Sequence, residues 1–201
     1  AYRRENTYFP NSTSGAKGLP SEREQAILLQ AGVPQDHPMF QRAFELPRTD
    51  GSGNPRPQLK EAVRLLKDAG YRLEQDQLYA PDGNPVKVEF MVDHASMTRV
   101  IQPFIRNLKK IGVKATIRSV DETKCKARMD KFEYDITVMS LPQSQIPSYE
   151  LRLFFHSTQA NKTASYNYAG IQSNEIDKLL DSLAGANSLD DIYLTTSAID
   201  R

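Results

Sequence analysis

The stretch "NLKKIGVKATIRSVDETKCKARMDKFEYDITVMS", residues 107–140, decides the predicted fold of this chain. It holds a strand pattern at 113–120, a helix pattern with an acidic start at 121–132, and a second strand pattern at 134–140. Strand, helix and strand in this order are typical of a parallel sheet with right-handed crossover connections. The stretch therefore predicts an α/β fold.

The sequence before this stretch predicts a helix, a turn and another helix. Residues 58–71, "QLKEAVRLLKDAGY", have apolar residues at helical spacing and stop at Gly70. The "APDGNP" turn at 80–85 separates two alternating apolar runs, which is hairpin chemistry, and a helix is expected at 96–112. Pro103 is expected to kink or interrupt that helix unless it lies in an early turn. We expect a mixed, partly parallel sheet flanked by helices.

The N-terminal part differs in character. Residues 1–57 are rich in Pro, Gly, Ser and Asn, and they predict an irregular wrapping segment with one short helix at 21–32. Ser21 and Glu24 form a capping box at its start. We expect a boundary near residue 57, after which 58–201 form one α/β lobe.

Two helices are predicted near the C-terminus. In "NYAGIQSNEIDKLLDSL", residues 167–183, Ser173 or Asn174 is the expected N-cap of an amphipathic helix. The last helix has its N-cap at Ser188 or Asp190 and stops without a C-cap, which indicates a piece cut from a longer chain.

Composition excludes several function classes. With 26 basic and 25 acidic residues the net charge is +1, which offers no electrostatic footprint for nucleic acid. No apolar run is long enough to cross a bilayer. Cys125 is the single cysteine, so an internal disulfide and a cysteine-cluster metal site are excluded. His37, His94 and His156 lack metal-ligand spacing, and neither a metal nor a cofactor is expected.

Ligands of such sheets bind beyond the carboxyl ends of the strands. In this chain those ends are residues 93–96, 120–122 and 140–148. Asp93 and Ser96, in the first of these loops, are candidate ligand-binding residues.

The motifs of residues 107–140, then "PQS" and "SYNYAGIQSNEIDKLLDSL", stand in a specific order between about Gln58 and Leu183. The ordered set resembles the C-terminal lobe of the family 5 solute-binding proteins of bacterial ABC transporters. "TYFPNSTSGAKGLPS" and "TDGSGN" look further like the oligopeptide-binding subgroup that includes the microcin-importing type. The resemblance implies a periplasmic-binding-protein-like lobe without enzymatic activity, periplasmic or otherwise extracytoplasmic and membrane-associated. It implies three partners, namely a peptide or oligopeptide ligand, the permease of an ABC importer, and the missing lobe of the same chain.

The resemblance also implies ligand contacts. The family's ligand loop corresponds here to Ser140, Leu141, Pro142, Gln143, Ser144 and Gln145. Leu141 stands near the family's Trp, and Gln143 or Ser144 stands near an Asp that pairs with the peptide amino terminus, so that carboxylate is absent. Glu150 is either its substitute or an exposed helical glutamate. Arg128 matches a basic position that meets a peptide carboxylate bidentately, or it is a solvated helix arginine.

Two other function classes stay open. Asp93, His94 and Ser96 suggest a small hydrolase with its site at the strand ends, but neither a nucleophile elbow nor an oxyanion signature accompanies them. The third class is a non-catalytic interaction domain. Tyr166 and Tyr168 either stack on a ligand or pack on the sheet, and packing is favoured. We expect no catalytic residues.

Overall fold

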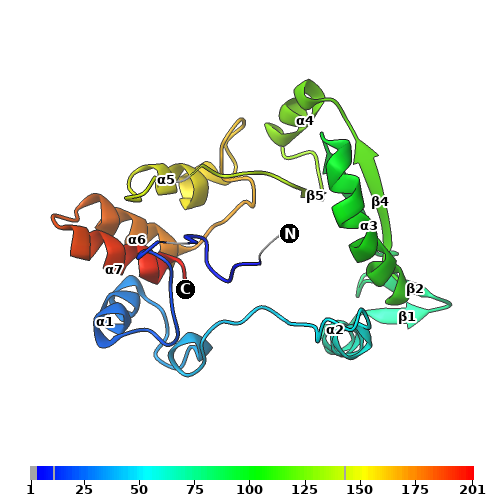
Figure 1. Cartoon of the computed structure of the whole chain (residues 1–201), viewed down its shortest axis with the longest axis horizontal. Helices are drawn as coiled ribbons and strands as arrows, with labels where there is room; N and C mark the ends of the chain where they lie inside the picture. Colours follow the sequence, from blue (N-terminus) through cyan, green and yellow to red (C-terminus); the bar gives the residue numbers. More distant parts are fainter. Residues whose placement is uncertain (1–3, 11, 143) are drawn as a thin grey trace. The chain divides into compact units, whose positions relative to one another are not determined.

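The computed structural model describes residues 4–10, 12–142 and 144–201. The helices and strands are, in chain order, α1 (Glu22–Ala31), the 3₁₀-helix η1 (Pro38–Phe40), α2 (Arg56–Asp68), β1 (Arg72–Glu74), β2 (Gln77–Tyr79), β3 (Lys87–Val92), α3 (Ala95–Lys110), β4 (Lys114–Ser119), α4 (Glu122–Met129), β5 (Ile136–Thr137), α5 (Glu150–Phe155), the 3₁₀-helix η2 (Ser157–Gln159), α6 (Asn174–Ala184) and α7 (Leu189–Ile199) (Figure 1). Across these described ranges, no helix combines the length and apolarity of a membrane span.

The chain divides into two compact units. The helical unit combines Ala1–Leu46 with Leu141–Arg201, and the sheet unit is the continuous segment Pro47–Ser140. This division differs from the expected one, which placed the boundary near residue 57 and kept 58–201 together. The reason is that the two ends of the chain share a core.

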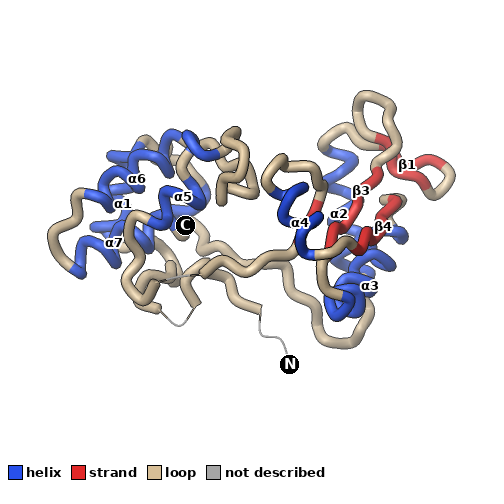
Figure 2. Tube along the Cα trace, turned by 90° about the horizontal axis from the view of Figure 1, so that it is seen from above, coloured by secondary structure: helices blue, strands red, loops and turns tan. Residues whose placement is uncertain are grey.

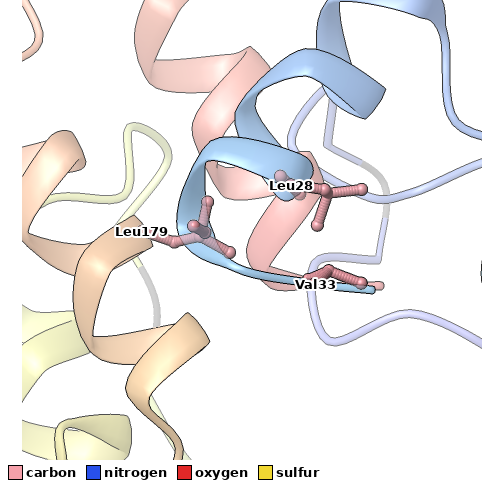
Figure 3. Close-up of a cluster of buried hydrophobic side chains, with 5 residues drawn as sticks. Leu28, Val33 and Leu179 are labelled. Carbon is pink, nitrogen blue, oxygen red and sulfur yellow. The ribbon is translucent and has the colours of Figure 1, made fainter. Parts of the chain in front are cut away.

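In the helical unit, α1, α6 and α7 pack against one another. Leu28 and Val33 of the N-terminal part meet Leu179 of α6 and Ala198 of α7 (Figure 3). A second cluster places Phe9 against residues of α5 and α6. The N-terminal segment thus completes the core of the C-terminal helices, because an amphipathic helix must bury its apolar face against another element.

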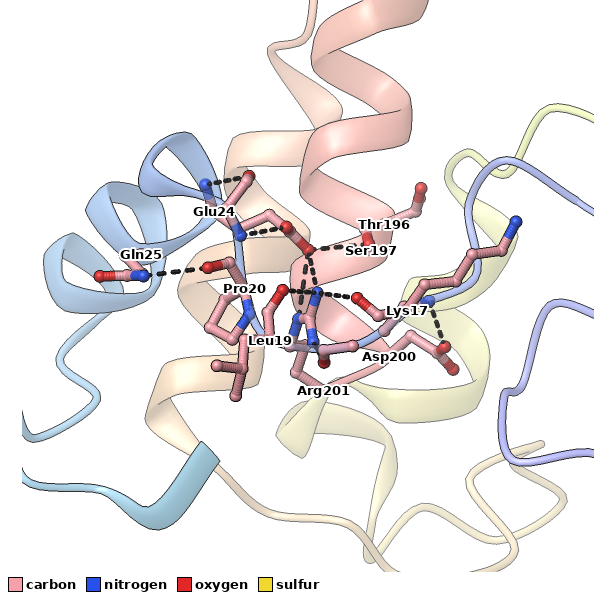
Figure 4. A network of polar contacts seen from close by, with 12 residues as sticks. Lys17, Leu19, Pro20, Glu24, Gln25, Thr196, Ser197, Asp200 and Arg201 are labelled. Carbon is pink, nitrogen blue, oxygen red and sulfur yellow. Dashed lines mark hydrogen bonds and ion pairs between the residues drawn. The ribbon is translucent and has the colours of Figure 1, made fainter. Parts of the chain in front are cut away.

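Polar contacts tie the same two segments together. The Asp200 carboxylate accepts hydrogen bonds from Thr7 Oγ1 at 2.5 Å, Tyr8 N at 2.6 Å and Ala16 N at 2.8 Å. Beside it, the Arg201 guanidinium donates to Glu24 Oε1 and to backbone carbonyls of the N-terminal segment (Figure 4). The end of α7 is therefore fixed by charge-assisted hydrogen bonds.

The sheet unit contains the predicted parallel sheet, with strand order β4-β3-β5. Figure 2 shows β3 and β4 side by side. Phe90 of β3 packs with Ile101 of α3 on one face. Because side chains alternate along a strand, Met91 points to the other face, where Thr137 donates to its carbonyl. Cys125 of α4 lies close to Thr137 on this face, so α3 and α4 cover opposite faces. The α/β fold class is confirmed.

The hairpin of this unit lies elsewhere than expected. β1 and β2 pair antiparallel across Gln75 and Asp76, whose φ angles of 47° and 62° fit a two-residue turn of type I′. The predicted hairpin at 77–92 forms at its turn only. There Ala80 N donates to the Asn84 carbonyl and Val86 N to the Leu78 carbonyl, each at 2.8 Å, beside an isolated bridge between Tyr79 and Pro85. β3 cannot pair further with β2, because β4 and β5 occupy both of its edges.

Two boundaries in the sheet unit also differ from the predicted ones. α3 continues through Pro103, which is exposed together with Arg99, so the carbonyl that loses its helical donor can be hydrated. The strand predicted at 134–140 contracts to Ile136–Thr137, because only these residues pair with β3.

Ser173 is the N-cap of α6, as the sequence predicts. Its hydroxyl accepts from Ile176 N at 3.3 Å and donates to Glu175 Oε2 at 2.6 Å. Ser173→Ala is expected to lower the free energy of unfolding by about 1 kcal/mol, because Ile176 N loses its side-chain acceptor, whereas Ser173→Gly costs only roughly a few tenths. Urea denaturation of both variants measures the difference, and equal losses contradict the capping role.

Candidate functional site

The carboxyl ends of the three parallel strands meet at one edge of the sheet unit. Asp93 follows β3, Asp121 follows β4, and Ser140 comes three residues after β5. Asp93 is half-buried, and Ser96 and Ser140 are exposed. Asp121 accepts from Lys124 N at 2.9 Å as the N-cap of α4. The sheet unit thus brings Asp93, Ser96 and Ser140 to one edge. Among the described hydrogen bonds, none uses their side chains to cap a helix, in contrast to Asp121.

Hydrolytic chemistry finds no support at this edge. His94 Nε2 lies 3.9 Å from Asp93 Oδ1, and within the described residues no hydrogen bond joins His94 to Ser96. Burial, and then the negative charge of Asp93, raise the pKa of the Cys125 thiol, against a hydrogen bond with Thr137. The thiol therefore stays protonated and is a poor nucleophile.

Arg128 lies in the last turn of α4. Its Nε donates to the Glu133 carbonyl at 3.0 Å, and the side chain is half-buried. A crossover helix leads from the carboxyl edge of a sheet back toward its amino edge. Arg128 therefore closes the turn before β5, at the opposite end of α4 from Asp121.

The predicted ligand loop continues into the helical unit. Pro142, Ser144 and Gln145 are exposed and Leu141 is half-buried, while Gln143 lies outside the described residues. The loop has no regular secondary structure and leads through Ser148 to α5. Among its described polar side chains, Ser144 hydrogen-bonds to Glu150 and Gln145 is exposed.

Glu150, the first residue of α5, is the residue that sequence reasoning underrated. It is half-buried, so its interpretation as an exposed helical glutamate is wrong. Ser148 Oγ donates to Glu150 Oε2 at 2.6 Å, and Oε1 is buried with no donor among the described residues. Burial works to raise the pKa of Glu150, but hydrogen bonds from Ser148 and Ser144 outweigh it and hold the pKa below its ordinary value. An enclosed carboxylate oxygen without a donor is costly, so this position favours an incoming N–H group.

Within the described residues, no three His, Cys, Asp or Glu side chains gather as metal ligands do. The polar groups at the strand ends and in the following loop are hydroxyls, carboxylates and amides. Such groups bind polar organic ligands by hydrogen bonds.

Comparison with known families decides the assignment. The family described as "Bacterial extracellular solute-binding proteins, family 5 Middle" matches residues 3–162. The chain belongs to this family. The resemblance seen in the sequence motifs is confirmed, and the place of this family 5 chain within the whole protein stays a prediction.

Two curated relatives of the family 5 chain come from Agrobacterium fabrum. The peptidoglycan-binding protein YepA is 34% identical over 202 residues, and the probable peptide-binding protein YejA is 34% identical over 203 residues. Each alignment covers 100% of this chain and 33% of the relative. The chain thus spans about a third of the length of the curated relatives it matches.

A solved structure shows the same fold. The oligopeptide-binding protein AppA from Bacillus subtilis, in complex with a nonapeptide, matches 89% of this chain and 36% of its own, with a TM-score of 0.62 and 20% identity. At this identity the likeness concerns the fold alone. It agrees with a periplasmic-binding-protein-like α/β architecture.

Proposed function

We propose that this family 5 chain is part of the substrate-binding component of an ABC importer, and that its ligand is a peptide or oligopeptide. The observation that carries the proposal is family membership, together with 34% identity to a probable peptide-binding protein. The protein binds without catalysis, works in the periplasm, and delivers its ligand to the importer's permease. The rest of the protein supplies the second lobe.

We propose ligand contacts for each unit by itself. For the sheet unit they are Asp93, Ser96 and Ser140. For the helical unit they are the loop residues Leu141, Pro142, Gln143, Ser144 and Gln145. Glu150 adds the carboxylate that the loop itself lacks. Arg128 is left out of the sheet unit's set, because it lies at the end of α4 opposite Asp121 and its Nε is held by the Glu133 carbonyl.

Mass spectrometry of ligands that copurify with the full-length protein tests the proposal. Peptides in the protein fraction, released on denaturation and rebound in calorimetric titration, are the expected result. Turnover of model esters or peptides, without stoichiometric binding, would replace the importer assignment with the hydrolase alternative.

Glu150→Gln is expected to weaken binding of a copurified peptide about ten- to a hundredfold, because a hydrogen bond to a charged group is worth roughly 1.5–3 kcal/mol. A synthetic copy with an acetylated amino terminus should bind Glu150→Gln and the wild type equally. Calorimetry with both peptides measures the difference.

Glu175→Gln is the matched control, since Glu175 also accepts from a serine hydroxyl in the first turn of a helix. It should leave both affinities unchanged. If Glu150→Gln lost the same affinity for the free and for the acetylated peptide, Glu150 would only shape the loop.

A further inference from the structure

Tyr166 presents an exposed aromatic ring from a closely fixed backbone. Tyr166 is 51% exposed, whereas its neighbours Ser165 and Asn167 are 4% and 0% exposed. Asn167 Nδ2 donates to the His156 carbonyl at 3.3 Å and to the Ile171 carbonyl at 2.9 Å, and Asn167 Oδ1 accepts from Ile171 N at 2.9 Å. The backbone on both sides of the ring is thus held by buried hydrogen bonds.

The ring orientation is also set. Tyr166 meets Phe154 edge to face, with centroids 6.0 Å apart and planes at 84°, and meets Tyr168 at 6.0 Å and 87°. Phe154 is buried and continues the row of rings through Phe155 to Tyr8. The predicted packing of Tyr166 on the sheet is wrong, because its ring contacts are aromatic side chains of the helical unit.

Local strain accompanies this exposed ring. Ala164, two residues before Tyr166, has φ 61°, a left-handed conformation that a residue with a Cβ adopts at a cost. Strained backbone that holds an exposed aromatic ring does little for folding, because the ring stays half in water. Backbone strain of this kind clusters at ligand-binding positions.

We propose that Tyr166 is a stacking platform for an uncharged, planar or CH-rich face of the ligand. The inference rests on the proposed function and narrows it. The rings of Phe154 and Tyr168 stand nearly at right angles to that of Tyr166, and neither contact brings a charge. An aromatic ring fixed in this way recognises flat apolar faces, which an aromatic peptide side chain and a sugar ring both offer. The platform thus gives the ligand a preferred position for one ring.

Calorimetric titration of the full-length protein with three probes tests this inference. The probes are triphenylalanine, trialanine and a disaccharide of N-acetylglucosamine. Tyr166→Ala is expected to lower the affinity for the probe that stacks about five- to tenfold. It should change the affinity for trialanine by less than about twofold. Tyr166→Phe, the matched control, keeps the ring and should retain wild-type affinity.

The two ring-bearing probes identify the source of the stacked face. A selective loss for triphenylalanine assigns it to a peptide side chain, and a selective loss for the disaccharide assigns it to a sugar. Unchanged binding of every probe by Tyr166→Ala, or an equal loss that includes trialanine, overturns the platform while wild-type peptide binding still supports the proposed function. If the wild type binds none of the three probes, both the platform and the proposed function are overturned.

Discussion

Gly112→Ala is expected to lower the free energy of unfolding of the sheet unit by about 2–5 kcal/mol. Gly112 has φ 80°, and an added Cβ would lie 2.4 Å from Leu73 Cδ1 and 2.7 Å from Leu78 N. Leu78 N also donates to the Gly112 carbonyl at 2.7 Å, so that backbone atom cannot retreat without losing a hydrogen bond. The hairpin of β1 and β2 therefore packs against Gly112 at a distance that only glycine permits.

Gly83→Ala is the matched control. Gly83 has φ 85°, and an added Cβ would meet no atom within 4 Å, so this variant carries the conformational cost of roughly 1–2 kcal/mol alone. Urea denaturation of the two variants separates strain from overlap. Equal destabilisation would show that the close approach at Gly112 adds nothing.

Glu24→Ala is expected to cost about 3–5 kcal/mol, because it leaves the Arg201 guanidinium buried without its counter-charge. Arg201 Nη2 lies 2.8 Å from Glu24 Oε1, and the two side chains are only 7% and 10% exposed. Ser197 Oγ donates to the same oxygen at 2.9 Å, and Ser21 N donates to Glu24 Oε2 at 2.7 Å (Figure 4). Thermal unfolding of the variant measures the loss.

The same carboxylate gives stability a dependence on pH. Burial works to raise the pKa of Glu24, but hydrogen bonds from Ser21, Arg201 and Ser197 hold the pKa below its ordinary value of 4.5. A lowered folded-state pKa stabilises the protein above the unfolded pKa, and this contribution is lost as the pH falls through the folded value. Wild type should therefore lose more stability than Glu24→Gln when the pH falls below 4.5.

Arg23→Ala provides the control for burial. Arg23 and Asp190 also join α1 to α7, at 2.6 Å, but their side chains are 60% and 73% exposed. Solvent screens such a pair, so its removal should change stability little. A loss as large as that of Glu24→Ala would contradict burial as the source of the effect.

Local signals predicted the helices well. The capping box of Ser21 and Glu24 and the N-cap Ser173 lie where the sequence places them. These features depend on residues three or four positions apart, so sequence order alone specifies them. The β1–β2 hairpin was missed because Gln75 and Asp76 lack the glycine that marks most turns with positive φ.

Long-range packing accounts for most of what could not be predicted. Nothing near Leu28 in the sequence indicates that its partners are Leu179 and Ala198, so the boundary between the units was misplaced. For the site, the exposed loop followed from the strand-end rule, which is topological. The enclosure of Glu150 and the exposure of Tyr166 depend on how α5 meets neighbouring loops, and no spacing in the sequence records that.

The discontinuous helical unit imposes an order on folding during synthesis. The sheet unit is one continuous segment, Pro47–Ser140, and can close as soon as it has left the ribosome. The bond from Tyr8 N to Asp200 spans 192 positions, so the helical unit cannot close until Asp200 emerges. At about 5–20 residues per second, the ribosome needs roughly 3–12 s after Ser140 to reach that point. During this interval the apolar side chains of Leu28 and its neighbours stay exposed, because their partners Leu179 and Ala198 have not yet been made.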